Sequence, residues 1–337
     1  MTLPWGSGTA TGVGSLPGTD PAEAARVVLG ELPELPFLPE LPARGAIADL
    51  AGRTCALLAD MPVDLQPGGW RLVERPGRDQ RRAQDALARD LDALEDAYAG
   101  TSPPVLKVQA AGPWTLAASL ELRGLERALS DQGAVRDLTA SLAEGLSLHL
   151  VDLSRRLPGA TLLLQLDEPS LPSVLAARIP TSSGFATLRA PQPNLVAEHL
   201  RTVLGAVAAV PGAQSLVHCC APHPPVPLLL AAGAQHLSLD ATLLTESDDD
   251  AIGTAVEGGA GLLLGCVPAA DAPLAGTDAV LAPVRGLWRR LGFPGETLPA
   301  TVVLTPTCGL AGASGGYARQ ALQACVRAAA ALAEEPL

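Results

Sequence analysis

Two short segments contain residue types that bind transition metals. The first is VHCCA at Val217–Ala221, and the second is LTPTCG at Leu304–Gly309. Each belongs to an apolar run typical of a β-strand, in which alternate side chains share a face. His218 and Cys220 should therefore point into one space, where Cys308 can join them from the second segment. One imidazole and two thiolates are ligands that zinc prefers, so the sequence predicts a metal–thiolate site.

Asp240 is the predicted fourth ligand. It ends the strand-like run Gln235–Asp240, which follows the His218 segment along the chain. A carboxylate is the weakest ligand of such a set, and a substrate thiolate can displace it most easily. A thiol that binds zinc ionises at neutral pH and becomes a nucleophile, which favours a catalytic zinc over a closed structural one. The alternative is structural: the HCC segment ends a buried strand, and Cys308 is a small residue in a turn.

Carboxylates form a second candidate group. Asp167 and Glu168 come directly after the apolar run Thr161–Leu166. Two carboxylates at this place cost desolvation free energy unless a cation or hydrogen-bond donors meet them. A substrate ammonium would meet this need, whereas the alternative is a pair that caps a helix at the start of a loop. Glu40 lies in a rigid, proline-rich segment and can add another carboxylate.

Strand-like runs alternate with helical segments along most of the chain, as in βα units. The candidate strands centre on Gly12–Leu16, Phe37–Leu41, Val105–Ala110, Thr161–Leu166, Gln214–Cys219, Gln235–Leu239, Gly261–Cys266 and Thr301–Leu304. Longer helices are predicted from Asp20 to Leu32 and over Arg81–Ala99, Ala134–Leu157, Asn194–Val210 and Tyr317–Glu335. Strands that are each followed by a helix predict an α/β protein, and their number predicts a (β/α)8 TIM barrel. A doubly wound open sheet is the alternative.

The residues just past these strands agree with a barrel, because barrel enzymes place their chemistry at the carboxyl ends of the strands. At this end lie Ser15, Glu40, Trp114, Asp167, Glu168, His218, Cys220, Asp240 and Cys308. The run Gly261–Cys266 is the exception, since it ends without a clear polar group. Chance would scatter such residues over both ends of the strands.

The composition limits the classes of function. The chain has 337 residues and a net charge of −12, and Lys107 is its only lysine. Such an acidic chain, without a basic run, is a poor candidate for binding nucleic acid or an anionic membrane. Neither a signal peptide nor an apolar span of about 20 residues is predicted, so the cytoplasm is the expected compartment.

The scattered cysteines do not suggest a disulfide framework. Residues 1–337 are predicted to form one domain, with a Pro/Gly-rich excursion at about 60–77.

Five motifs occur in an order that resembles a known family. They are TGVGSLP at Thr11–Pro17, GPWTL at Gly112–Leu116, QLDEPSL at Gln165–Leu171, HCC at His218–Cys220 and CGL at Cys308–Leu310. Together they resemble the C-terminal catalytic barrel of cobalamin-independent methionine synthase, over nearly the whole chain. The resemblance implies a barrel of the uroporphyrinogen-decarboxylase type. It also implies a zinc-dependent methyltransferase that methylates homocysteine to give methionine.

The resemblance further implies roles for individual residues. The implied zinc ligands are His218, Cys220, Cys308 and Asp240, which replaces the family's usual glutamate. The implied substrate-binding residues are Gly14, Ser15, Glu40, Asp167 and Trp114. In this scheme Asp167 and Glu40 bind the amino group of homocysteine, and the backbone around Ser15 binds its carboxylate. Trp114 lies in the family's Gly-Pro-x-Thr segment, where an aromatic ring can stack on a pterin or a corrinoid.

Two classes of methyl donor stay open. The chain resembles a short, stand-alone branch of the family, because it holds one barrel where the long synthases hold two. The family's Asp-x-His stretch, which is tied to protonation of the folate leaving group, reads here as Ala269–Asp271. Both 5-methyltetrahydrofolate and a methyl-corrinoid, either methylcobalamin or a corrinoid protein, are therefore candidate donors. The alternative functions are a barrel decarboxylase, a corrinoid-dependent methyltransferase for another thiol such as coenzyme M, and a non-catalytic zinc- or corrinoid-binding partner.

Overall fold

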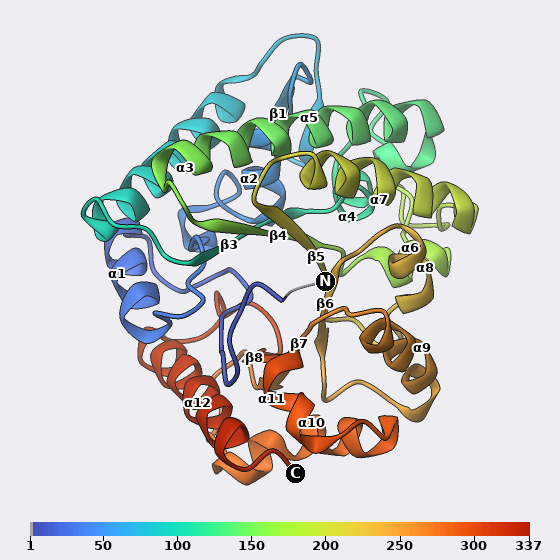
Figure 1. Cartoon of the computed structure of the whole chain (residues 1–337). Helices are drawn as coiled ribbons and strands as arrows, with labels where there is room; N and C mark the ends of the chain where they lie inside the picture. Colours follow the sequence, from blue (N-terminus) through green and yellow to red (C-terminus); the bar gives the residue numbers. More distant parts are fainter. Residues whose placement is uncertain (1–2) are drawn as a thin grey trace.

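A curled parallel sheet forms the centre of the molecule, surrounded by helices (Figure 1). The computed structural model describes residues 3–337. The strands of the sheet are β3 (Val105–Ala111), β4 (Thr161–Asp167), β5 (Ala213–Cys219), β6 (His236–Asp240), β7 (Leu262–Val267) and β8 (Val302–Pro306). Each pairs in parallel with the next one along the chain. The α/β class and the last six predicted strands are therefore confirmed.

The first two predicted strands are the exception, because Gly12–Leu16 and Phe37–Leu41 do not form regular strands. Single parallel bridges instead join Ala10 to Leu304 in β8, Ser15 to Glu40, and Phe37 to Lys107 in β3. The prolines in and beside the second segment cannot donate hydrogen bonds to a ladder. In the first segment, a Cβ on Gly12 would lie 2.4 Å from the ring of Phe37. Regular strand pairing is therefore absent from these two segments, because prolines lack N–H groups in the second and Phe37 packs closely on the backbone of the first.

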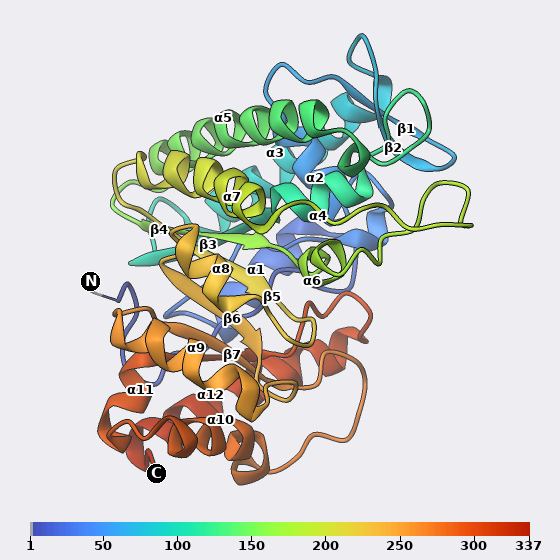
Figure 2. The same ribbon diagram turned by 90° about the vertical axis from the view of Figure 1, so that its right-hand side faces the viewer.

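Helices cover the outer face of the sheet, as two views at right angles show (Figures 1 and 2). They are α1 (Pro21–Glu31), α2 (Leu50–Leu57), α3 (Arg78–Tyr98), α4 (Pro113–Ser119), α5 (Gln132–Arg156), α6 (Leu171–Leu175), α7 (Pro193–Ala208), α8 (Val226–Ala231), α9 (Glu246–Glu257), α10 (Thr277–Leu291), α11 (Leu298–Thr301) and α12 (Gly315–Glu334). Short 3-10 helices lie at Pro42–Arg44, Ala128–Ser130 and Gly295–Thr297. The five longer helices predicted from the sequence correspond to α1, α3, α5, α7 and α12, with ends that differ by a few residues.

The Pro/Gly-rich excursion forms a hairpin that the sequence did not predict. Strand β1 (Val63–Gln66) pairs antiparallel with β2 (Gly69–Leu72). Arg71 in β2 forms a 2.7 Å ion pair with Glu121, which follows α4. The backbone N–H of Leu72 also donates to the carbonyl oxygen of Glu121 at 2.8 Å. The hairpin is therefore fastened to the connection between α4 and α5.

The inner face of the sheet changes from apolar to polar along the strands. Near the strand starts, one cluster of buried side chains consists of Trp5, Leu35, Val105, Leu163, Leu216, Leu263 and Val303. Two residues further along their strands, Lys107, Gln165 and His218 are also buried. Residues two apart on a strand share a face, so both sets point inward. An apolar layer therefore closes one end of the interior, and polar groups lie between it and the carboxyl ends of the strands.

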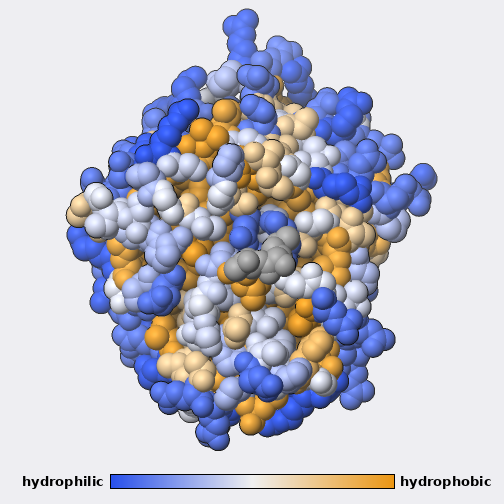
Figure 3. Space-filling view, in the orientation of Figure 1, coloured by the Kyte–Doolittle hydropathy of each residue, from blue (hydrophilic) through white to orange (hydrophobic). Residues whose placement is uncertain are grey.

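The surface in the orientation of Figure 1 is hydrophilic around its outline, and hydrophobic residues lie nearer its centre (Figure 3). Within residues 3–337, no helix combines the length and the apolar character needed to cross a lipid bilayer.

Gly145 tests the packing of α5 against the end of α2. A Cβ at this position would lie 1.7 Å from the carbonyl oxygen of Leu57. We expect Gly145→Ala to lower the free energy of unfolding by about 1–3 kcal/mol, because the backbone must move to admit the methyl group. This loss should occur although alanine favours a helix more than glycine does. Urea unfolding followed by circular dichroism measures the change.

Gly205 in α7 provides the matched control. A Cβ there would meet nothing within 4 Å. Gly205→Ala should therefore be neutral or raise the free energy of unfolding by up to about 1 kcal/mol. Equal effects of the two substitutions would contradict the contact between α5 and Leu57.

Candidate metal and substrate site

The three strongest predicted metal ligands lie together at the carboxyl ends of two strands. His218 lies in β5, Cys220 directly follows β5, and Cys308 follows β8. Their ligand atoms all lie within 4.8 Å of one another. The two Sγ atoms are 3.4 Å apart. This group offers one imidazole nitrogen and two sulfurs to a metal ion such as zinc.

A hydrogen bond orients the imidazole of His218. Its Nδ1 lies 2.8 Å from the Oγ of Ser238 in β6, where the strand register pairs the two residues. Its Nε2 is buried and has no hydrogen-bond partner among residues 3–337. A buried polar atom without a partner is costly, so Nε2 is the nitrogen that is placed to bind a metal. Ser238 then holds the ring as the hydrogen-bond partners of metal-binding histidines do.

The two thiols differ in their tendency to ionise. A hydrogen bond from Cys220 and the nearby His218 hold the pKa of the Cys308 thiol well below its usual range. The same contact, together with burial, raises the pKa of Cys220. The two sulfurs therefore share one proton, because a second negative charge beside the first is unfavourable. A divalent cation would allow both sulfurs to ionise.

Asp240, the predicted fourth ligand, lies outside this group, and the expected set of four is corrected to three. It ends β6, two residues beyond Ser238. Its Oδ1 accepts hydrogen bonds from the backbone N–H of Thr242 at 2.9 Å and from the Thr242 hydroxyl at 2.6 Å. The carboxylate thus stabilises the turn after β6. A short aspartate that accepts these local hydrogen bonds is held away from the sulfurs.

A cavity of about 200 Å³ adjoins the three ligands. Its walls include Gly14, Ser15, Glu40, Asp167, His218, Cys220 and Cys308. The predicted substrate-binding residues other than Trp114 therefore line one space next to the predicted metal ligands. A volume of this size suits a molecule as small as an amino acid.

Asp167 ends β4 and is buried where it meets the cavity. The side-chain N–H of Gln165 donates to its Oδ1 at 2.7 Å. Burial raises the pKa of Asp167 to about 6, although His218 and Lys107 act in the opposite direction. A buried carboxylate with a raised pKa is stabilised by an added cation, such as an ammonium group.

Glu40 meets the same cavity from the second irregular segment. Its Oε1 lies 3.5 Å from Nε of Arg53, and neither atom has a hydrogen-bond partner among the described residues. Asp90 forms ion pairs with both Arg53 and Arg44, so the charge of Arg53 is shared between two carboxylates. Burial raises the pKa of Glu40 to about 7 despite the presence of Arg53. Glu40 therefore keeps the capacity to accept a hydrogen bond from a bound cation.

Trp114 does not lie at the cavity, so its predicted stacking role is corrected. It is almost completely buried near the start of α4. Its Nε1 donates to the carbonyl oxygen of Val196 in α7 at 3.1 Å, and its ring packs edge-to-face on His199. The side chain fills the space between α4 and α7. Helix α4 begins only two residues after β3 ends, and Trp114, as its second residue, points away from the sheet interior.

Glu168 caps the start of α4. Helix capping was the alternative to substrate binding that the sequence analysis gave for this residue. Its Oε1 accepts from the backbone N–H of Trp114 at 2.9 Å. Its Oε2 accepts from the backbone N–H of Thr115 at 2.7 Å and from the Thr115 hydroxyl at 2.8 Å. The positive end of the helix dipole favours a carboxylate at this place. Asp167 and Glu168 are adjacent in sequence and yet face different sides of the sheet.

Several residues that shape the site were missed in the sequence. Ser238 and Gln165 occupy alternate positions within apolar strands, and that alternation was a usable signal of polar groups facing inward. Arg53 and Asp90 lie on separate helices, and no pattern in the sequence indicates that they meet behind Glu40. Their roles depend on tertiary packing alone.

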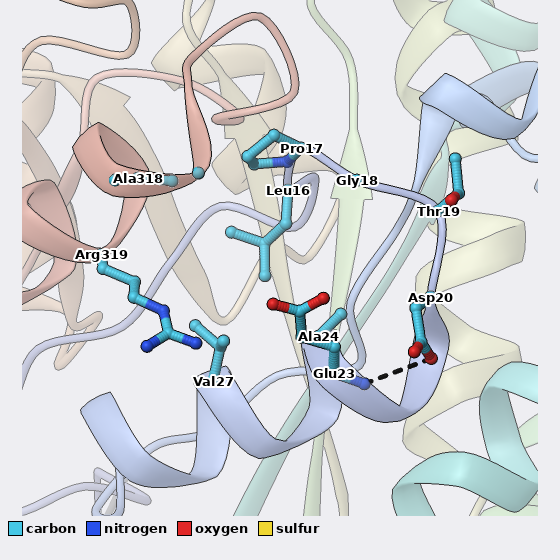
Figure 4. A pocket seen from close by; sticks show the side chains of 12 residues that line it. Leu16, Pro17, Gly18, Thr19, Asp20, Glu23, Ala24, Val27, Ala318 and Arg319 are labelled. Atoms are coloured by element: carbon cyan, nitrogen blue, oxygen red, sulfur yellow. Dashed lines mark hydrogen bonds between the residues drawn. The ribbon is translucent and has the colours of Figure 1, made fainter.

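A larger cavity of about 460 Å³ lies between the Leu16–Asp20 loop and the first turns of α1 and α12. Figure 4 shows Glu23 and Arg319 on its walls, and the Oδ1 of Asp20 accepting a hydrogen bond from the N–H of Glu23. These charged side chains are exposed and therefore solvated. The smaller cavity is the better candidate for chemistry, because buried groups with shifted pKa values converge there.

Comparisons with known proteins indicate the family and the fold of the chain. The family described as cobalamin-independent synthase, catalytic domain, matches residues 8–331. Among solved structures, a B12-independent methionine synthase from a Shewanella species, in complex with selenomethionine, has a TM-score of 0.63 at 12% identity and covers 98% of both chains. That likeness shows a shared fold. A 2,3-dimethylmalate lyase covers 97% of this chain and 84% of its own at 12% identity, with a TM-score of 0.40 that is too low to carry an argument. No curated protein matches the sequence.

Substitutions at Glu168 test its role as a cap of α4. Glu168→Ala removes the acceptor of three hydrogen bonds, and we expect it to lower the free energy of unfolding by about 2–4 kcal/mol. Glu168→Gln keeps one acceptor oxygen and should cost less than the alanine variant. Chemical denaturation near neutral pH measures both. Glu23→Ala, at an exposed position in α1, should change the free energy of unfolding by no more than about 0.5 kcal/mol. If Glu168→Ala were equally mild, Glu168 would not be a cap.

Proposed function

The chain belongs to the family of cobalamin-independent synthase catalytic domains, and we propose that it transfers a methyl group to the thiol of homocysteine to give methionine. One observation carries the proposal: His218, Cys220 and Cys308 converge beside a cavity that two buried carboxylates also line. A thiol-activating group and an ammonium-binding group thus adjoin the same small space. Homocysteine carries a thiol and an ammonium group on one short chain.

Zinc is the metal that we propose for this site. The residues fit it, because two sulfurs and an imidazole with an unpartnered, buried Nε2 lie within 4.8 Å of one another. Catalytic zinc sites commonly have three protein ligands and leave a fourth position for water or substrate. When bound, zinc would supply Lewis-acid stabilisation of a thiolate at neutral pH.

The side chains around the cavity would bind and orient the amino-acid part of the substrate. Glu40 and Asp167 would accept hydrogen bonds from the ammonium group, and each lacks a cation that fully neutralises it within the site. The backbone around Gly14 and Ser15 would receive the carboxylate. Binding the ammonium and carboxylate groups, which are attached to the same carbon, would hold the thiol at the other end of the molecule beside the sulfurs of Cys220 and Cys308. This positioning contributes to the rate by removing freedom before the reaction.

We propose 5-methyltetrahydrofolate as the methyl donor, because the family is defined by its independence from cobalamin. The corrinoid donor kept open by the sequence has no support from the comparisons. In the proposed reaction the substrate sulfur forms a bond to the methyl carbon, and the bond from that carbon to N5 of the folate breaks. The electron pair stays on N5, which takes up a proton. The thiol of homocysteine loses one proton when it ionises, so charge and atoms balance overall.

We also propose that the two irregular segments complete the six strands to an eight-membered barrel and that the chain works as one domain. Backbone hydrogen bonds support the barrel. Thr11 N donates to Leu304 O in β8 at 3.0 Å, and Leu38 N donates to Lys107 O in β3 at 2.9 Å. A third bond, from Leu16 N to Glu40 O at 2.8 Å, joins the two segments to each other.

Metal analysis tests the proposed zinc site. The purified chain should contain about one zinc ion per molecule, by the stoichiometry of a mononuclear site. Cys308→Ser should lose most of it, because a hydroxyl is a much poorer zinc ligand than a thiolate. Cys219→Ala should keep it, because Cys219 is buried and is not one of the three residues whose ligand atoms lie within 4.8 Å of one another. A wild-type chain that neither contains zinc nor takes it up from solution would contradict the site.

Product analysis tests the reaction and its donor. Zinc-loaded protein, homocysteine and 5-methyltetrahydrofolate should give methionine, detected by mass spectrometry, and Cys308→Ser should abolish its formation. Methylcobalamin in place of the folate is the parallel assay. Methionine formed from methylcobalamin alone would overturn the proposed donor, and its absence with both donors would overturn the proposed reaction.

A further inference from the structure

Lys107, the only lysine of the chain, is completely buried inside the sheet. Its Nζ donates to the carbonyl oxygen of Val13 at 2.6 Å, to Oε1 of Gln165 at 3.0 Å and to Oε1 of Gln109 at 3.3 Å. It also lies 5.4 Å from the centre of the Phe37 ring. An ammonium group has three N–H donors and no acceptor. All three donors are therefore used: one reaches the N-terminal segment, one reaches β4, and one stays within β3.

The contact with Gln165 fixes the orientation of that amide. Because Lys107 can only donate, it holds Oε1 of Gln165 toward itself and turns Nε2 the other way. Nε2 then donates to Val13 O at 2.9 Å and to Oδ1 of Asp167 at 2.7 Å. The ammonium thus sets the position of the Asp167 carboxylate through one intervening side chain.

The contact with Gln109 acts in the same way on the other carboxylate segment. With Oε1 of Gln109 facing Lys107, its Nε2 donates to the carbonyl oxygen of Leu38 at 2.6 Å. Leu38 lies two residues before Glu40. The side chain of Gln109 also packs against Gly14, where an added Cβ would lie 2.9 Å from it. The segments that hold Glu40, Gly14 and Asp167 therefore all depend on groups bound to one buried ammonium.

We propose that Lys107, acting through Gln165 and Gln109, is the positioning residue for the amino-acid end of the substrate site. Lys107 does not itself line the cavity formed by the described residues. It places the Val13–Ser15 backbone, the Asp167 carboxylate and the segment of Glu40 at fixed distances from one another. The metal ligand His218 is oriented separately, by Ser238. The assignment rests on the proposed function, since it takes an amino acid as the ligand of these groups.

This division of labour has a specific consequence for binding. Loss of Lys107 should weaken a ligand that uses the ammonium- and carboxylate-binding groups. It should leave a simple thiol, which uses the metal alone, nearly unaffected. A general distortion of the site would weaken both ligands together.

The test is calorimetric titration of zinc-loaded protein with homocysteine and, separately, with 2-mercaptoethanol. Lys107→Met should weaken homocysteine binding about tenfold or more, the size expected when charged hydrogen bonds are lost. It should change 2-mercaptoethanol binding by less than about threefold and leave the zinc content unchanged. Gln165→Glu is the second variant, for the case that Lys107→Met does not fold. It keeps an acceptor for Lys107 but removes the donor to Val13 and Asp167, so the same selective loss is expected.

His236→Gln is the matched control. His236 is also buried on the inner face, but it bonds Gln214 and Gly261 near the strand starts, so both ligands should bind as in the wild type. Equal weakening of both ligands in Lys107→Met and Gln165→Glu, or no weakening of homocysteine, would overturn the positioning role. A wild-type protein that binds homocysteine no better than 2-mercaptoethanol would overturn the proposed amino-acid substrate itself. The two failures are therefore distinguishable.

Discussion

Polar side chains inside the sheet must find their partners there, because an apolar layer closes one end and helices cover the outside. This constraint ties the site together. The ammonium group of Lys107 donates all of its N–H groups to oxygens from the N-terminal segment, β3 and β4. Gln165 continues the same chain of hydrogen bonds to Asp167. The bonds from Lys107 to Val13 and Gln165, and from Gln109 to Leu38, join segments that are distant in sequence. Satisfying these buried groups therefore also sets the irregular N-terminal segments against the regular strands. These hydrogen bonds between the N-terminal segments and the strands therefore determine the shape of the cavity.

The parts of the fold that were predictable from the sequence are those set by local patterns. The apolar runs that became β3 to β8 and the long amphipathic helices α3, α5 and α7 carry their periodicity in the sequence itself. Other parts depend on partners elsewhere in the chain. The segments at Gly12–Leu16 and Phe37–Leu41 have strand-like composition, but their glycines and prolines leave only isolated bridges. The hairpin β1–β2 is fixed by contacts with Glu121, which no local pattern contains.

The same distinction separates the predicted site residues. His218, Cys220 and Cys308 could be grouped from the sequence, because strand alternation and a shared sheet end decide which way they point. Asp240 has the right place in the strand order, but hydrogen bonds to Thr242 decide where its carboxylate lies. Trp114 lies away from the cavity for a related reason, since it belongs to the packing of α4, and Glu168 takes the capping role that the sequence offered as an alternative. The position of a residue at a strand end thus indicates where its backbone lies. The structure of the following turn or helix decides which way its side chain points.

Charge balance links the metal-binding and carboxylate-binding halves of the site. Two sulfurs and the carboxylates of Glu40 and Asp167 surround one small cavity, and the nearest cations are Lys107 and a shared Arg53. Burial disfavours the ionised forms of these two acids, as the pKa values of Glu40 and Asp167, raised to about 7 and about 6, indicate. A metal at the sulfurs and an ammonium at the carboxylates would each lower this electrostatic cost. A ligand that brings an ammonium and a sulfur together therefore matches both halves at once, whereas a thiol without the ammonium satisfies only one.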